Sequence, residues 1–129
     1  MRIKLTSLYV DDHEKALRFY TDVLGFVKKG DVTHGGYRWL TVVSPEEPEG
    51  VELQLALNDS PAARAYQQAL FQQGQPATIF HTADLSREYE RLSGLGVTFT
   101  VPLTTENWGS RAVLDDTCGN LIQLTQPAW

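Results

Sequence analysis

Apolar and polar residues alternate between Ile3 and Val10, where the chain has the sequence IKLTSLYV. Successive side chains of a β-strand point to opposite faces, so this alternation predicts a strand with two chemically different faces. One face carries Thr6, Leu8 and Val10, and the other carries Leu5, Ser7 and Tyr9.

The hydrophobic spacing becomes helical after this strand. Asp11 and Asp12 come first, and an aspartate at this position can accept a hydrogen bond from the first free N–H groups of a helix. The pattern ends at Gly25, as is common just after the last helical turn. The apolar residues at helical spacing are Ala16, Leu17, Tyr20, Val23 and Leu24.

Three further strands are predicted in the first half of the chain. A short one covers residues 26–29, and one rich in β-branched and aromatic residues covers 37–44, after the turn sequence HGG. The last follows Gly50 and alternates as VELQLAL. The first half is therefore predicted to have the order β-α-β-β-β.

The second half repeats this order after a connecting helix. Ser60 and Pro61 form a typical helix start, and good helix formers continue to Gly74. A strand from Ala77, a helix capped by Asp84 and three short strands follow. We therefore expect a single domain over 1–129, with module one at 1–58, a connecting helix at 60–74 and module two at 75–129.

The register of the repeat can be checked, because a slip of one residue turns every side chain of a strand to the opposite face. The repeat aligns Asp12 with Asp84 and Gly50 with Gly119. It also aligns Tyr9 with His81 and Gln54 with Gln123. Each helix covers one face of its sheet, so the other faces are expected to be free to line a cavity for a small molecule.

Composition narrows the classes of partner. The formal charge is −5 and no run of Lys and Arg occurs, so neither nucleic acid nor an anionic membrane is expected as a partner. The segment MRIKLTSLYV is too polar for a signal peptide, and the one cysteine, Cys118, excludes an internal disulfide. A cytoplasmic location is expected.

Two segments carry a resemblance to a known family. SLYVDDHEKALRFYTDVLGF and LDDTCGNLIQLTQ resemble the glyoxalase I, bleomycin resistance protein and extradiol dioxygenase group, the vicinal oxygen chelate superfamily. The resemblance covers nearly the whole chain. It implies an α+β fold of two βαβββ modules that form a half-open barrel, and it implies a homodimer.

In metal-dependent members of that superfamily, the first and last strands of each module supply the metal ligands. The matching positions here are Leu5, Ala77, Gln54 and Gln123. Aliphatic side chains and neutral amides are poor ligands for a divalent cation, so no cofactor is expected and a divalent metal is disfavoured. Glu52 and His81 are the residues that would hold a metal if one were bound.

Several polar and aromatic residues are candidates for chemistry or recognition. His81 has a side chain whose ordinary pKa suits a general base, although a structural histidine fits the pattern equally. Ser7, Tyr9, Gln54 and Gln123 are expected to contact a ligand. The segment NWGSRAV adds Trp108 as a flat apolar surface and Arg111 as a fork for a carboxylate or phosphate, unless Arg111 pairs with a neighbouring aspartate.

One ambiguity and three functions follow from these residues. Arg38 and Trp39 point to opposite faces of one strand, and the sequence does not decide which of them lies on the side of the cavity. The favoured function is metal-free binding of a small organic ligand. The alternatives are an enzyme, either a metal-dependent lyase or dioxygenase with an unconventional site or a metal-free isomerase that uses His81, and a scaffold for protein interaction.

Overall fold

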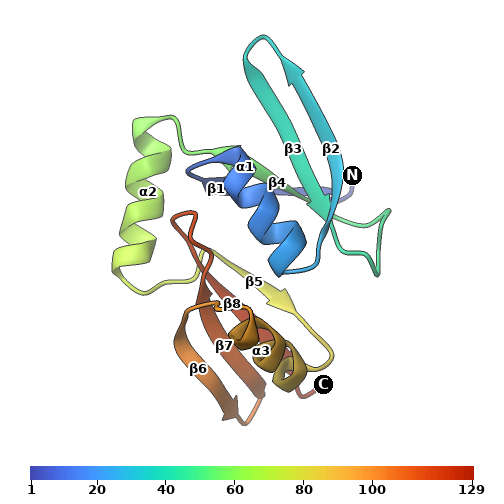
Figure 1. Cartoon of the computed structure of the whole chain (residues 1–129), viewed down its shortest axis with the longest axis vertical. Coiled ribbons are helices and arrows are strands. Elements are labelled where there is room, and N and C mark those ends of the chain that lie inside the picture. The colour runs from blue at the N-terminus through green and yellow to red at the C-terminus, as the bar shows by residue number, and fades with distance from the viewer. The chain divides into compact units, whose positions relative to one another are not determined.

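The first half of the chain has the predicted order of strands and helix. The computed structural model describes all residues, 1–129. Strand β1 pairs in parallel with β4, and β3 joins β4 to β2 by antiparallel pairing, which gives the sheet order β1-β4-β3-β2 (Figure 1). The elements are β1 (Leu5–Val10), α1 (His13–Arg18), a π-helical turn (Phe19–Val23), β2 (Val27–His34), β3 (Tyr37–Val43) and β4 (Glu52–Leu57).

Helix α1 begins where the aspartate pair predicts. The side chain of Asp12 accepts a hydrogen bond from the backbone N–H of Lys15 at 2.8 Å, which satisfies one of the free donors of the first turn. The helix widens into the π-helical turn before Gly25, whose φ of 92° few other residues adopt readily. The chain can therefore reverse into β2 directly after Gly25.

Strand β2 is longer than the predicted strand over residues 26–29. The reason is the turn that follows it, because Gly35 and Gly36 have φ values of 58° and 79°. Two consecutive residues with positive φ form the tight hairpin turn that matches the twist of the flanking strands. The turn places His34 opposite Tyr37, and pairing with β3 then continues back to Val27 with one bulge.

Helix α1 covers one face of this sheet. It packs against β4, and a ring nitrogen of His13 lies 3.1 Å from the backbone oxygen of Leu55 in that strand. Burying aliphatic side chains of this kind stabilises a fold by roughly 1.5–3 kcal/mol each. The buried apolar residues of β1, α1, β3 and β4 include Leu8, Val10, Ala16, Leu40, Val42, Leu53 and Leu55.

The second half repeats the topology of the first. Its sheet has the order β5-β8-β7-β6, with β5 parallel to β8 and the other pairs antiparallel. Helix α2 (Pro61–Gln72) precedes this sheet. The other elements are β5 (Thr78–His81), α3 (Leu85–Gly94), β6 (Phe99–Glu106), β7 (Gly109–Asp115) and β8 (Leu121–Pro127).

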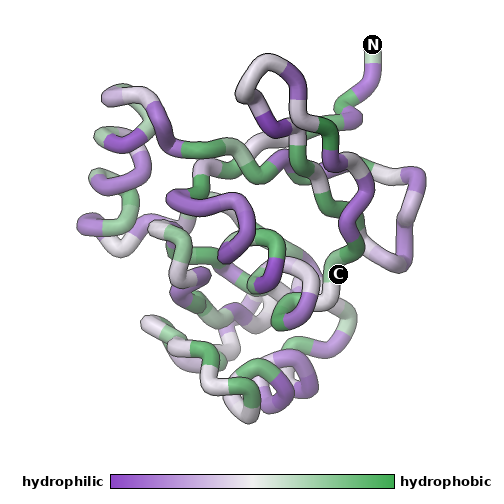
Figure 2. Tube along the Cα trace, turned by 45° about the horizontal axis from the view of Figure 1, so that its top comes forward, coloured by the Kyte–Doolittle hydropathy of each residue, from purple (hydrophilic) through white to green (hydrophobic).

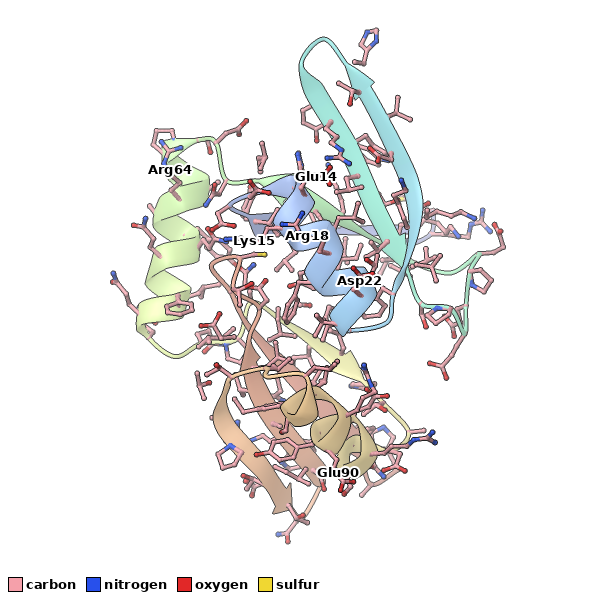
Figure 3. The ribbon with its side chains drawn as sticks, viewed as in Figure 1. Glu14, Lys15, Arg18, Asp22, Arg64 and Glu90 are labelled. Atoms are coloured by element: carbon pink, nitrogen blue, oxygen red, sulfur yellow. The ribbon has the colours of Figure 1, made fainter.

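Helix α3 covers one face of the second sheet and packs against β6, β7 and β8. The side chain of Asp84 caps it by accepting a hydrogen bond from the N–H of Arg87 at 3.1 Å. The helix contributes Leu85 and Leu92 to a core that also contains Ala112, Leu114, Ile122 and Leu124. Figure 3 labels Glu90 on this helix.

The chain divides into two units, Met1–Arg64 and Ala65–Trp129. Each contains one four-stranded mixed sheet with the same strand order, so the predicted α+β class with two βαβββ modules is confirmed. Hydrophobic and hydrophilic residues are interspersed along both units, as alternating strands and amphipathic helices require (Figure 2). Each helix is too short or too polar to be a membrane span.

Candidate functional site

The candidate site begins on the face of the first sheet that lies opposite α1, which we call the open face. Ser7 of β1 pairs with Gln54 of β4, and Gln54 pairs with Thr41 of β3. Paired residues on neighbouring strands project from the same face, so these three polar residues form a row across the sheet. Tyr9 projects from the same face as Ser7, as the alternation of β1 predicts.

A directed chain of hydrogen bonds joins two residues of this row, Ser7 and Gln54, to Tyr37 of β3. The hydroxyl of Ser7 donates to Oε1 of Gln54 at 2.9 Å, and Nε2 of Gln54 donates to the phenol oxygen of Tyr37 at 2.7 Å. The amide of Gln54 is therefore bonded at both ends, and its side chain is buried while the ring of Tyr37 is exposed. We call these three residues the Gln54 relay.

A second polar chain lies beside the first. The backbone N–H of Gly30 donates to the hydroxyl oxygen of Thr41 at 3.0 Å, and that hydroxyl donates to Oε1 of Glu52 at 2.6 Å. Glu52 lies two residues before Gln54 in β4 and thus on the same face. Its carboxylate is half-buried and held by Thr41, so it is part of the sheet surface rather than a freely moving side chain.

The structure decides which of Arg38 and Trp39 shares the open face. Arg38 lies on the α1 side, where it forms an ion pair with Glu14 of that helix, a residue labelled in Figure 3. It also binds Asp31 of β2 through Nε and Nη2, both at 2.9 Å. The two hydrogen bonds from Arg38 lower the pKa of Asp31 to about 2, and the two carboxylates raise the pKa of Arg38.

Trp39 therefore lies on the open face, two residues from both Tyr37 and Thr41. Its indole packs against the backbone at Gly30 in the paired strand β2, where an added Cβ would come within 3.4 Å of Cδ1 of the ring. The same Cβ would approach the Thr41 hydroxyl to 3.0 Å. A glycine at this position lets the indole lie close to the strand, with 38% of the residue exposed.

The second sheet has a corresponding open face. Ile79 of β5 pairs with Gln123 of β8, in the same register as Ser7 and Gln54 in the first sheet. Nε2 of Gln123 donates to the hydroxyl oxygen of Thr125 at 3.0 Å. The aligned glutamines therefore hold equivalent positions, but an isoleucine replaces the serine that would complete a relay in the second sheet.

A row of three residues crosses the second sheet at Thr125, which lies two residues after Gln123 in β8 and on the same face. His81 pairs with Thr125, and Thr125 pairs with Arg111 of β7. Neighbouring strands lie about 4.8 Å apart, so the backbones of His81 and Arg111 are about 10 Å apart with Thr125 between them. Arg111 is half-buried, and neither Asp115 nor Asp116 forms an ion pair with it.

Trp108 lies in the turn between β6 and β7 rather than within a strand. The turn joins Glu106 and Gly109, which are paired, and the backbone oxygen of Trp108 accepts a hydrogen bond from Ala128 at 2.7 Å. Its indole is 38% exposed, and it lies three residues from Arg111 along the chain. The turn thus places Trp108 next to the end of β8, a short way along the strands from the row of His81, Thr125 and Arg111.

The residues at the positions of the expected metal ligands do not fit a divalent cation. Leu5 and Ala77 offer no donor atom, and Gln54 and Gln123 offer neutral amides. The amide oxygen of Gln54 already accepts the hydrogen bond from Ser7. Glu52, the carboxylate on this face, accepts a hydrogen bond from Thr41.

Three polar residues of these faces were missing from the sequence-based set of site residues, namely Tyr37, Thr41 and Thr125. Strand alternation places Thr125 on the face of Gln123 and places Tyr37 on the face of Trp39. The sequence does not show which strands are neighbours, and the phenol of Tyr37 in β3 bonds Gln54 in the adjacent strand β4. The pairing of Thr41 with Gln54 sets the register of β3 against β4 and so brings Tyr37 within reach of Gln54.

The sequence matches known proteins over almost its whole length. The family model described as the Glyoxalase/Bleomycin resistance protein/Dioxygenase superfamily matches residues 2–124. The uncharacterized protein YurT of Bacillus subtilis (strain 168) is 52% identical over 126 residues, which are 98% of this chain and 99% of YurT.

Two solved structures are similar in both fold and sequence. The crystal structure of UcmS2 has a TM-score of 0.84 and 32% sequence identity, and the match covers 97% of each chain. The crystal structure of TnmS3, an antibiotic binding protein from Streptomyces sp. CB03234, has a TM-score of 0.79 and 27% identity. That match covers 99% of this chain and 97% of TnmS3.

Proposed function

Because the chain belongs to the glyoxalase/bleomycin resistance protein/dioxygenase superfamily, we propose that it binds a small organic ligand on the open faces of its sheets. The observation that carries this proposal is the Gln54 relay beside the exposed indole of Trp39. Ligand sites combine apolar and aromatic surface with a few fixed polar groups, and this face has both. A planar ligand suits the flat indole.

The uncharged character of the relay favours binding over metal chemistry. Ser7, Gln54 and Tyr37 are joined by hydrogen bonds and carry no charge, so they are suited to orienting a neutral group of a ligand. The likeness to TnmS3, an antibiotic binding protein, supports the same class of function. Tyr9, on the same face as Ser7, is proposed as a further aromatic contact.

The open face of the second sheet is proposed to recognise an anionic group. Arg111 and His81 flank the hydroxyl of Thr125, and Gln123 donates to that hydroxyl. A guanidinium presents a planar fork that matches a carboxylate or phosphate, and an imidazole adds a further donor. His81 has in this proposal the role of a hydrogen-bonding group, and Trp108 that of an apolar contact beside the row.

A thermal-shift screen with planar organic compounds, both neutral and anionic, tests the proposed function. A compound present at 100 times its Kd should raise the melting temperature by roughly 5–10 °C. The shift should fall for Trp39→Ala and Gln54→Ala if the ligand contacts the first sheet, and for Trp108→Ala and Gln123→Ala if it contacts the second. Trp129→Ala removes an exposed indole outside both sheets and is the matched control.

The screen would contradict the proposal if no compound stabilised the wild-type protein. Elemental analysis of the purified protein separates binding from the alternative of a metal-dependent enzyme. Stoichiometric zinc, nickel, manganese or iron would favour the enzyme, because a binding protein of this kind needs no metal.

The homodimer and the cytoplasmic location expected from the sequence remain predictions. Light scattering of the purified protein measures the first directly. A single species with the mass of one chain, 14.4 kDa, would contradict the homodimer.

A further inference from the structure

We propose that Tyr37 is a specificity-determining hydrogen-bond donor, and that the ligand of the first sheet is a planar molecule with an uncharged acceptor, such as a ring carbonyl. This inference rests on the proposed ligand-binding function and adds the polarity of the ligand to it. It follows from the direction of the hydrogen bonds in the Gln54 relay, that is, from which group donates and which accepts in each bond.

The relay begins at Ser7, whose hydroxyl hydrogen is donated to Oε1 of Gln54 over 2.9 Å. In this orientation the amide oxygen of Gln54, which can only accept, faces Ser7, and the amide nitrogen, which can only donate, lies at the other end. Nε2 of Gln54 must then face Tyr37, and it donates to the phenol oxygen over 2.7 Å. The phenol thus acts as an acceptor toward the sheet.

A phenol that accepts from the sheet keeps its own hydrogen for another partner. The O–H of Tyr37 can donate away from Gln54, and the residue is 57% exposed, so that donor is accessible. The opposite orientation of the amide would direct the phenol hydrogen to Oε1 of Gln54 and leave only acceptor capacity for a ligand. The orientation of the Gln54 amide therefore determines whether Tyr37, on the neighbouring strand, offers a donor or only an acceptor to a ligand.

Trp39 determines the shape of the molecule that can use this donor. It lies two residues from Tyr37 on the same face of β3, so the two side chains start about 6.8 Å apart. Its indole is held close to the strand over Gly30. A flat ring that lies on the indole can place a carbonyl oxygen at its edge within reach of the Tyr37 hydroxyl.

Calorimetric titration with two probes of the same shape tests the proposal. The probes are 9-oxofluorene-2-carboxylate, which has a ring carbonyl, and fluorene-2-carboxylate, which lacks it. The wild-type protein should bind the ketone about five- to tenfold more tightly, as expected for one added hydrogen bond. In Tyr37→Phe the ratio of the two affinities should fall to about one, with binding of the hydrocarbon retained.

Variants of Ser7 separate the direction of the relay from a purely structural effect. In Ser7→Ala the amide oxygen of Gln54 loses its donor, so the amide can reverse and accept the hydrogen of the Tyr37 hydroxyl instead. The ratio should then fall toward one although Tyr37 is intact. Ser7→Thr keeps a hydroxyl and should restore the ratio. Tyr89→Phe removes a phenol from α3 in the second unit and should leave the ratio unchanged.

Several outcomes would overturn the proposal. Equal affinity of the wild-type protein for both probes would remove Tyr37 as a donor but leave ligand binding in place. A ratio that persists in Tyr37→Phe would assign the carbonyl to another residue. Failure of the wild-type protein to bind the ketone at millimolar concentration would exclude the proposed ligand class, while other compounds in the thermal-shift screen would still test the proposed function.

Discussion

Gln54 and Gln123 hold equivalent positions in the two sheets, but only Gln54 is hydrogen-bonded at both ends of its amide. Gln54 bonds Ser7 through its oxygen and Tyr37 through its nitrogen, whereas Gln123 bonds Thr125 through its nitrogen. The repeat has thus kept the residue and changed its surroundings. The difference has consequences for stability that can be measured without a ligand.

Replacing Gln54 with alanine should destabilise the protein more than replacing Gln123. Gln54→Ala breaks two hydrogen bonds of a buried side chain, each worth about 1 kcal/mol, so it should cost about 2 kcal/mol. Gln123→Ala breaks one bond at a half-buried position and should cost about 1 kcal/mol or less. Urea unfolding of the two variants and the wild-type protein measures the difference, and equal costs would show that the relay contributes nothing to stability.

The ion pair of Asp31 and Arg38 should make stability depend on pH in the acid range. Arg38 lowers the pKa of Asp31 from 3.8 to about 2, so the folded state binds this proton less readily than the unfolded state. The stabilisation is fully present above pH 4 and is lost as the pH falls toward 2. Urea unfolding at several pH values in this range should show the advantage of the wild-type protein over Asp31→Asn shrinking as the pH falls.

Asp59→Asn is the matched control for this measurement. Asp59 lies in the loop before α2 and takes part in no ion pair. A difference between wild type and Asp31→Asn that stays constant from pH 5 to pH 2 would contradict the proposed coupling to Arg38. An NMR titration of the Asp31 carboxyl group would give its pKa directly.

Local signals in the sequence were sufficient for the order of the elements and for the faces of β1. The caps at Asp12 and Asp84, the glycine turn of the first hairpin and the alternation of β1 all depend on residues close together in the chain. The agreement of propensity, capping and pattern at each element explains why the fold was predictable. The repeat then supplied the register between the modules.

The candidate site needed contacts that no local pattern contains. The placement of Arg38 depends on Glu14, a residue of α1 that is 24 positions away. The involvement of Tyr37 depends on a hydrogen bond to Gln54 that crosses from one strand to the next. Strand alternation left both possibilities open for β3, and the pairing of charged groups across space decides between them.

Gly109 should not tolerate a side chain. Its φ is 146°, and a Cβ there would lie 2.3 Å from the backbone oxygen of Gln126 and 2.9 Å from Cα of Pro127. Since both contacts are with backbone, neither can move aside cheaply, and Gly109→Ala should cost about 2 kcal/mol or more. Thermal unfolding of the variant would reveal the cost as a lower melting temperature.

Gly94→Ala is the matched control, because an alanine at this glycine should not lower the stability of the protein. Gly94 ends α3, and an added Cβ there would meet no atom within 4 Å. Alanine has the higher helix propensity by about 1 kcal/mol, so this variant should be as stable as the wild-type protein or slightly more stable. A similar loss of stability in both glycine variants would contradict the role of the close approach at Gly109.

The turn between β7 and β8 is held by a buried carboxylate. Oδ1 of Asp116 accepts hydrogen bonds from the N–H groups of Cys118 and Asn120 at 2.7 and 3.0 Å, and Oδ2 accepts one from Nδ2 of Asn120 at 2.9 Å. Gln67 of α2 donates to the backbone oxygen of Cys118 and to Oδ1 of Asn120, both at 3.2 Å. This network gives a physical role to the sequence DDTCGN, which the family resemblance identified only as a motif.

Asp116→Ala should therefore be among the most damaging substitutions in the second unit, whereas Asp115→Ala should be mild. Asp116 is fully buried and its loss leaves three donors without their acceptor, at a cost of about 3 kcal/mol or more. Asp115 accepts one hydrogen bond, from the backbone N–H of Thr117 at 2.8 Å, and is half-buried, so its loss should cost about 1 kcal/mol. Urea unfolding compares the two.

Asp116→Asn keeps the prediction testable if the alanine variant fails to fold. It preserves the shape of the side chain but puts an amide NH2 in place of one carboxylate oxygen, so one donor of the turn meets another donor. Its stability should lie between those of the wild-type protein and Asp116→Ala. If all three aspartate variants unfolded at the same urea concentration, the carboxylate would not be what holds this turn, and the backbone conformation at Thr117 and Gly119, with φ of 63° and 102°, would have to do so alone.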